Sequence, residues 1–160
     1  MPDLPIHALL IPVDGSSHSD RALTWAIDLA RKYSASLTVL SVVPLSAADY
    51  GGMAYVPQSA WEAQATYFRQ VAERAGARAR EAGISSVTVK VLEGSVAGGI
   101  LDYIADHAPD LVVIGSRGLG TGTRVLLGSV SDALVHHASC PVLVVKPTDA
   151  SSAPSGPARA

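Results

Sequence analysis

Short apolar runs alternate along this chain with longer stretches in which apolar residues recur at helical intervals. The short runs are rich in β-branched residues and end at turn formers or prolines, which is typical of buried strands. Apolar residues three or four positions apart indicate amphipathic helices between them. The predicted strands cover residues 6–13, 36–43, 86–92, 110–114 and 141–146, and the predicted helices begin near residues 17, 59, 95 and 130.

This order of elements predicts an α/β domain with five parallel strands. The run 6–13 is almost continuously apolar, which suits a central strand covered on both faces. Residues 86–92 alternate between apolar and polar, which suits a strand nearer an edge. We therefore expect a three-layer sandwich, with helices on both faces of the sheet. Ligands of such sheets bind beyond the carboxyl ends of the strands, where the strand order reverses.

Capping residues mark several helix ends. Ser17 and Asp20 have the spacing of a capping box, and Ser95 is placed to cap the helix that follows it. Gly83 is placed to end the helix that begins near residue 59.

The composition narrows the class of protein. The chain has 160 residues, 16% of them charged, and a formal net charge of −2, which argues against a nucleic-acid partner. No run approaches the roughly 20 apolar residues of a membrane helix, and no basic segment of a signal peptide opens the chain. The single Cys140 fits a reducing compartment. We expect a cytoplasmic protein with one domain over residues 1–147 and a disordered, Pro/Ser/Ala-rich tail over 148–160.

The glycine-rich stretch from Gly115 to Ser129 is the strongest candidate for a binding site. It lies between a predicted strand and a predicted helix, where backbone N–H groups can converge on an anion. It lacks the lysine of a P-loop, and it does not follow the first strand as a dinucleotide fingerprint does. A glycine-rich structural turn is the alternative interpretation.

The spacing Gly115-x2-Gly118-x9-Gly128-Ser129 resembles the nucleotide-binding motif of the universal stress protein family, G-x2-G-x9-G-[S/T]. The resemblance to the ATP-binding subgroup of this family extends over about residues 5–147. It implies the fold of the adenine nucleotide α-hydrolases, with strand order 3-2-1-4-5. Three further segments carry the resemblance: 11–16, 107–118 and 140–146.

The resemblance also implies a site for ATP. Asp14 matches the acidic residue that contacts the ribose and the adenine side, and Pro12 and Val13 would contribute backbone contacts. Val42 matches the valine that packs against the adenine ring. An apolar slot, a carboxylate and N–H groups at a helix start suit the three parts of this nucleotide. The phosphate side of the candidate site consists of Gly115, Arg117, Gly118, Gly128, Ser129 and Val130.

Charged residues near this stretch each have two interpretations. Asp132 has capping-box spacing to Ser129, so it is either a helix-capping carboxylate or a ligand for a divalent ion, Mg or Mn, bound with the phosphates. Arg117 and Arg124 either pair with phosphates or are solvated loop residues.

His136, His137 and Cys140 lie near the end of the chain's last helix and carry no recognisable motif. Adjacent histidines on a helix diverge, so we expect them to interact with the helix C-terminus rather than with a metal ion. Cys140 is predicted to be a packed side chain. We assign no catalytic residue and no metal ligand.

The predicted function is that of a nucleotide-responsive stress or signalling module that binds ATP, hydrolyses it slowly at most, and acts on an unidentified protein partner. An adenylating enzyme of the same fold and a nucleotide-independent partner-binding protein are the alternatives. AMP or a cyclic nucleotide could replace ATP. The strand from Pro141 to Lys146 is apolar and expected at a sheet edge, which predicts a homodimer through this strand.

Overall fold

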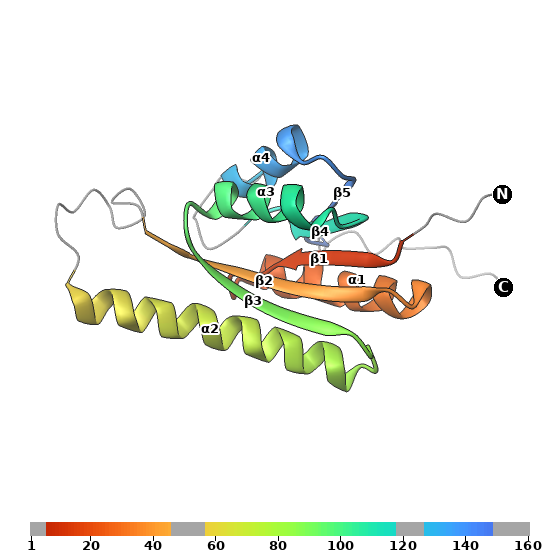
Figure 1. Cartoon of the computed structure of the whole chain (residues 1–160), viewed down its shortest axis with the longest axis horizontal. Coiled ribbons are helices and arrows are strands. Elements are labelled where there is room, and N and C mark those ends of the chain that lie inside the picture. The colour runs from red at the N-terminus through yellow and green to blue at the C-terminus, as the bar shows by residue number, and fades with distance from the viewer. Residues whose placement is uncertain (1–5, 46–56, 118–126, 149–160) are drawn as a thin grey trace, which may run out of the picture.

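The structure, a computed structural model, describes residues 6–45, 57–117 and 127–148. A single sheet lies between two pairs of helices (Figure 1). The predicted tail lies outside the described residues, except for Thr148. In chain order the elements are β1 (Ala8–Pro12), α1 (Ser17–Tyr33), β2 (Ser36–Pro44), α2 (Gln58–Glu81), β3 (Val87–Gly94), α3 (Val96–His107), β4 (Leu111–Gly115), α4 (Ser129–His137) and β5 (Val142–Val145).

The five strands are parallel and lie in the order β3-β2-β1-β4-β5, which confirms the predicted topology. On one side of β1, Ala8 lies opposite Ser36 of β2. On the other side, Leu9 lies opposite Leu111 of β4. The strand order reverses between β1 and β4, so the carboxyl ends of these two strands lie side by side.

Helices cover both faces of the sheet: α1 and α2 pack on one face, and α3 and α4 on the other (Figure 1). Leu9 and Ile11 of β1 point toward α1 and α2, whereas Leu10 points toward α3. All three side chains are buried. The apolar run of β1 is continuous because this strand is covered on both faces and paired on both edges.

β3 is an edge strand, as its alternating sequence predicted. Val87 and Val89 pack toward the core on the side of α1 and α2. Thr88 and Lys90 point to the opposite face, and both are exposed. The polar positions of this strand therefore lie where α3 does not cover the sheet.

α2 is the longest helix, with 24 residues, and its ends agree with the prediction to within a residue. Its positions away from the sheet are largely Arg, Glu and Gln. No helix in the described parts of the chain combines the length and apolarity needed to cross a membrane. The apolar face of this helix is buried at Ala65, Phe68, Ala72, Ala75 and Ala79, and half-buried at Trp61.

The start of α1 differs from the prediction by one residue. Ser16, not Ser17, is the N-cap, and its hydroxyl accepts a hydrogen bond from the N–H of Ser19 at 3.1 Å. Gly15 has a φ of +84°, so the chain turns into the helix earlier than the capping-box spacing indicates. The predicted capping box was wrong because Asp20 is one position too far along the helix to reach the cap.

Two other predicted caps are confirmed. The hydroxyl of Ser95 accepts a hydrogen bond from the N–H of Gly98 at 3.3 Å at the start of α3. Gly83 follows α2 with a φ of +92°, and its N–H donates to the carbonyl of Arg80 at 2.9 Å. A left-handed glycine in this position ends the helix without strain.

A carboxylate holds the beginnings of β1 and β4 together. Oδ2 of Asp110 accepts hydrogen bonds from the N–H groups of His7 at 2.7 Å and Ala8 at 2.9 Å. The N–H of Asp110 in turn donates to the carbonyl of Ala8 at 2.9 Å. The bonds from His7 and Ala8 stabilise the charged form and hold the pKa of Asp110 below its ordinary value.

We expect Asp110→Asn to lower the free energy of unfolding at pH 7 by roughly 1 kcal/mol, since an exposed charge-assisted bond contributes modestly. Because the pKa is lowered in the folded state, this stabilisation is present above the ordinary carboxyl pKa of about 3.9. It is lost as the pH falls through the lowered folded pKa. Urea unfolding at pH 7 and in acid measures both effects. Asp106→Asn, at an exposed position of α3, is the control. A difference from wild type that stays constant with pH would contradict the assignment.

Candidate functional site

The structure brings most of the predicted site residues to the carboxyl edge of the sheet. Three places supply most of them: the end of β1, the end of β4 and the start of α4 (Figure 1). Gly118 and Arg124 lie outside the described residues. The others are Pro12, Val13 and Asp14 at the end of β1, Val42 in β2, Gly115 and Arg117 at the end of β4, and Gly128, Ser129 and Val130 at the start of α4.

Asp14 belongs to a tight turn between β1 and α1. Its Oδ1 accepts a hydrogen bond from the N–H of Ser16 at 2.9 Å, which is an Asx turn. The hydroxyl of Tyr67 in α2 donates to the carbonyl of Asp14 at 3.3 Å. Gly15 has a φ of +84°, which favours glycine, and a Cβ there would also displace the Tyr67 hydroxyl.

Tyr67 is a residue that the sequence did not indicate. Its side chain lies beside the apolar face of α2 and is 38% exposed. The helical spacing of apolar residues therefore gave no reason to assign Tyr67 a role. Its ring meets that of Phe68 edge to face, with centroids 5.2 Å apart. α2 thereby touches the turn that carries Asp14.

The backbone of Val13 is already engaged within the sheet. Its N–H donates to the carbonyl of Leu40 at 2.8 Å, and its carbonyl accepts from the hydroxyl of Ser41 at 3.0 Å. Ser41 is 1% exposed. The side chains of Val13 and Val42 pack on opposite faces of the sheet, Val13 toward α1 and Val42 toward α3. Of these two side chains, only that of Val42 therefore lies on the face of the sheet that α3 covers.

Two donors hold the ends of the glycine-rich stretch together. The N–H of Gly128 and the hydroxyl of Ser131 both approach the carbonyl of Ser116, at 2.7 Å and 2.9 Å. The Ser131 hydroxyl also lies 3.0 Å from the carbonyl of Gly128. Ser131 is 2% exposed, and nothing in the sequence indicated this burial. We call these contacts among Ser116, Gly128 and Ser131 the loop clamp.

The start of α4 also differs from the prediction. Gly128 is the N-cap, and no side chain of the described residues accepts a hydrogen bond from the first N–H groups of this helix. The capping box predicted for Ser129 and Asp132 was wrong, because Asp132 lies one position beyond capping reach and its N–H donates to the carbonyl of Gly128. Its carboxylate lies 3.6 Å from Nδ1 of His136 instead, at the surface. Within the described ranges, the N-terminus of α4 therefore leaves backbone donors for another acceptor.

Gly115 is required by close packing. A Cβ at this position would lie 2.7 Å from both the carbonyl carbon and the carbonyl oxygen of His18. The end of β4 therefore lies directly against the first turn of α1. This approach brings the turn that carries Asp14 near the segment that follows β4.

The described residues contain no group of three or more His, Cys, Asp or Glu side chains arranged to hold a metal ion. His136 and His137 occupy the last turn of α4, as predicted, and their ring centroids are 6.3 Å apart. Cys140 packs against the cluster beneath α3 and α4, which confirms the prediction of a packed side chain. Burial raises the pKa of its thiol, so the reactive thiolate is disfavoured.

Known proteins share both this sequence pattern and this fold. A sequence model of the universal stress protein family matches residues 5–146. The universal stress protein YxiE of Bacillus subtilis is 30% identical over 145 residues, which cover 86% of this chain and 97% of the relative. The solved structure of the universal stress protein UspA from Lactobacillus plantarum is 27% identical, with a TM-score of 0.75, and the match covers 88% of this chain and 97% of that one.

Two more distant solved structures contain an adenine nucleotide. A universal stress protein family protein from Arabidopsis thaliana with AMP bound has 23% identity and a TM-score of 0.64, with 93% of this chain and 96% of that chain covered. A universal stress protein in complex with cAMP has 23% identity and a TM-score of 0.63, with 89% and 98% covered. At this level of identity the likeness shows a shared fold.

We expect Gly115→Ala to lower the free energy of unfolding by about 2 kcal/mol, because β4 or α1 must shift to admit the methyl group. Gly99→Ala is the matched control. A Cβ there would meet Val42 at an ordinary contact distance of 3.6 Å within α3. In a helix interior this change should be neutral or stabilising by about 0.5 kcal/mol. Chemical denaturation compares the two, and equal stabilities would show that β4 and α1 are not in contact at Gly115.

Proposed function

This chain belongs to the universal stress protein family, and we propose that it binds ATP at the carboxyl edge of its sheet and acts through that binding as a stress or signalling module. The observation that carries the proposal is the start of α4. No side chain among the described residues caps its first N–H groups, which lie beside the loop clamp, at the end of the predicted phosphate loop. Such a helix start favours a phosphate group. The AMP and cAMP complexes of related folds support an adenine nucleotide.

On the adenine and ribose side, the proposed roles follow from the backbone of Val13 and from the side chains of Asp14 and Val42. The N–H of Val13 is already donated to Leu40, so a hydrogen bond to adenine from this residue involves its carbonyl. A carbonyl oxygen has two lone pairs, and Ser41 occupies one of them. The exocyclic amino group of adenine is a donor that suits the other. Asp14 would bind the ribose, and Val42 would form part of the apolar wall on the α3 side.

On the phosphate side, the backbone N–H groups of Ser129 and Val130 would bind oxygens, and Arg117 would supply positive charge. A divalent ion, Mg or Mn, would be held chiefly by the phosphates and by water, because Asp132 is the carboxylate in the first turn of α4 and it faces His136. We assign no general base beside this site. The proposal therefore extends to slow hydrolysis at most.

The purified protein should bind ATP in a calorimetric titration, and small molecules released on denaturation should include an adenine nucleotide by mass spectrometry. Asp14→Ala should weaken ATP binding at least tenfold, the effect expected from losing about 1.5–3 kcal/mol of charged hydrogen bonding. Asp14→Asn preserves the Asx turn and should show the same loss, which separates the missing charge from a disturbed turn. Asp28→Ala, on the exposed side of α1, should bind as wild type does.

A protein that is purified empty and takes up no ATP in the calorimeter would contradict the proposal. Wild-type affinity in both Asp14 variants would show that the nucleotide binds elsewhere. In either case the folded state of each variant is checked by its unfolding transition.

We further propose that two copies pair through β5. This strand is an edge of the sheet and pairs with β4 on one side, so the backbone groups of its other side have no strand partner among the described residues. Val142, Leu143 and Val144 are half-buried. An apolar, unpaired edge is most simply covered by the same strand from a second copy related by a two-fold axis.

Light scattering at micromolar concentration should give twice the chain mass of 16.5 kDa. Val142→Lys places a charge on the pairing strand and should yield a monomer. Thr88→Lys adds the same charge to the opposite edge strand, β3, and should leave the dimer intact. A wild-type monomer, or equal effects of the two substitutions, would contradict pairing through β5.

A further inference from the structure

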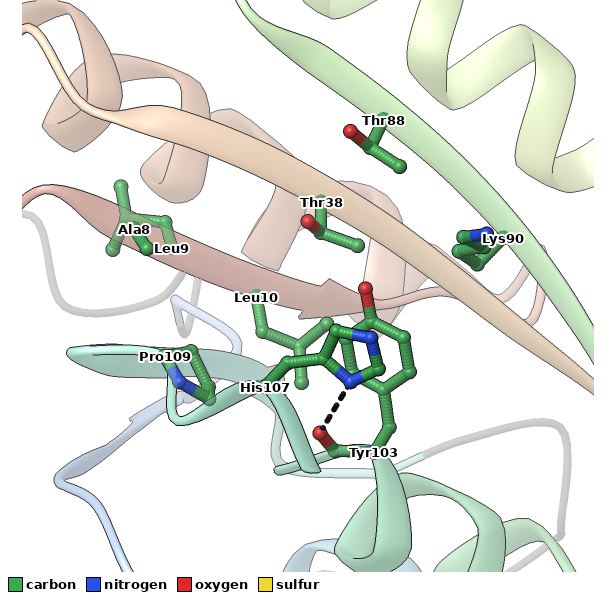
Figure 2. A pocket seen from close by; sticks show the side chains of 9 residues that line it. All are labelled: Ala8, Leu9, Leu10, Thr38, Thr88, Lys90, Tyr103, His107 and Pro109. Carbon is green, nitrogen blue, oxygen red and sulfur yellow. Dashed lines mark hydrogen bonds between the residues drawn. The ribbon is translucent and has the colours of Figure 1, made fainter. Parts of the chain in front are cut away.

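A cavity of about 350 Å³ lies on the α3 side of the sheet, apart from the proposed nucleotide site (Figure 2). Its lining comes from the amino-terminal halves of β1, β2 and β3 and from the end of α3. None of the predicted nucleotide-binding residues lines it. The cavity is therefore distinct from the proposed nucleotide site.

The register of the sheet explains why polar side chains line this cavity. Leu10 of β1 lies opposite Thr38 of β2, and Thr38 lies opposite Thr88 of β3. Lys90 follows two residues later on the same face of β3. α3 ends at His107, so this corner of the sheet is left without a covering helix. Figure 2 shows the two threonines and Lys90 along β2 and β3, across from the end of α3.

These polar groups are available to a ligand. Within residues 6–45, 57–117 and 127–148, the side chains of Thr38, Thr88 and Lys90 form no hydrogen bond or ion pair, and neither does the hydroxyl of Tyr103. The cavity thus presents three hydroxyl groups and one ammonium group. None of the described residues that line it is acidic.

An aromatic pair forms the opposite wall. The rings of Tyr103 and His107 are stacked, with centroids 3.8 Å apart and planes inclined by 8°. Nδ1 of His107 lies 3.1 Å from the carbonyl of Tyr103. A carbonyl only accepts, so Nδ1 carries the hydrogen and Nε2 is the acceptor in the neutral ring. This bond fixes the imidazole against the tyrosine, and Leu10 is fully buried in the core beneath the cavity.

We propose that this cavity binds a small aromatic carboxylate. The Lys90 ammonium selects an anion, and the hydroxyls of Thr38 and Thr88 donate to its carboxylate oxygens. The planar ring lies against the Tyr103–His107 pair, where aromatic contacts favour a flat apolar group. The volume is at the lower end of the ~300–1,000 Å³ typical of small-molecule sites, so a ligand with one ring fits.

Benzoate is the probe, and amide chemical shifts in ¹H–¹⁵N spectra are the measurement. Benzoate should give saturable shifts at Thr38, Thr88 and Lys90. Benzamide has the same ring without the charge and should bind at least tenfold more weakly, as expected for the loss of a charge-assisted contact. Lys90→Met retains the length of the side chain and should weaken benzoate binding about tenfold. Lys32→Met, at an exposed position of α1 on the other face of the sheet, should have no effect.

Any of three results would overturn the proposal: shifts that do not saturate at the solubility limit of sodium benzoate, equal affinities for benzoate and benzamide, or shifts centred on the carboxyl edge of the sheet. Lys90 is exposed, so its substitution leaves the core unchanged. Unaltered benzoate affinity in Lys90→Met would equally contradict the assigned role of the ammonium group.

Discussion

Parallel strands that end at one edge of a sheet leave backbone groups there without ladder partners, and those groups must be satisfied in another way. The Ser131 hydroxyl and the Gly128 N–H share the carbonyl of Ser116, while the Ser41 hydroxyl reaches that of Val13. A hydroxyl satisfies a buried carbonyl without bringing a charge into the core. The turns at the carboxyl edge are held in place by such bonds. In the described parts of the chain the buried polar residues are all serines: Ser16, Ser19, Ser41, Ser116 and Ser131.

The element order and the parallel sheet could be predicted because apolar runs and helical periodicity are well separated in this sequence, and the family resemblance supplied the strand order. The helix starts were less predictable. Ser16 and Gly128 cap α1 and α4, each one residue before the serine indicated by capping-box spacing. Spacing identifies side chains that are able to cap, whereas the backbone conformation of the preceding turn decides which residue occupies the cap position.

Other parts of the site depend on contacts between segments distant in the sequence. Tyr67 reaches the carbonyl of Asp14 across 53 positions, and Gly115 meets the backbone of His18 because β4 packs against α1. Periodicity describes one element at a time and contains no information on such approaches. The cavity beside Lys90 has the same origin, since it exists because α3 leaves the amino-terminal half of β3 uncovered.

The two edges of the sheet differ in chemistry. β3 carries Lys90 and Glu93, and the carboxylate of Glu93 lies 3.8 Å from the guanidinium of Arg69 on α2. β5 is short and apolar from Val142 to Val145. A sheet with one charged and one apolar edge can be extended in one direction only. Under the proposed pairing through β5, strand pairing between copies would close after a single step and would not propagate into a fibre by adding sheet to sheet.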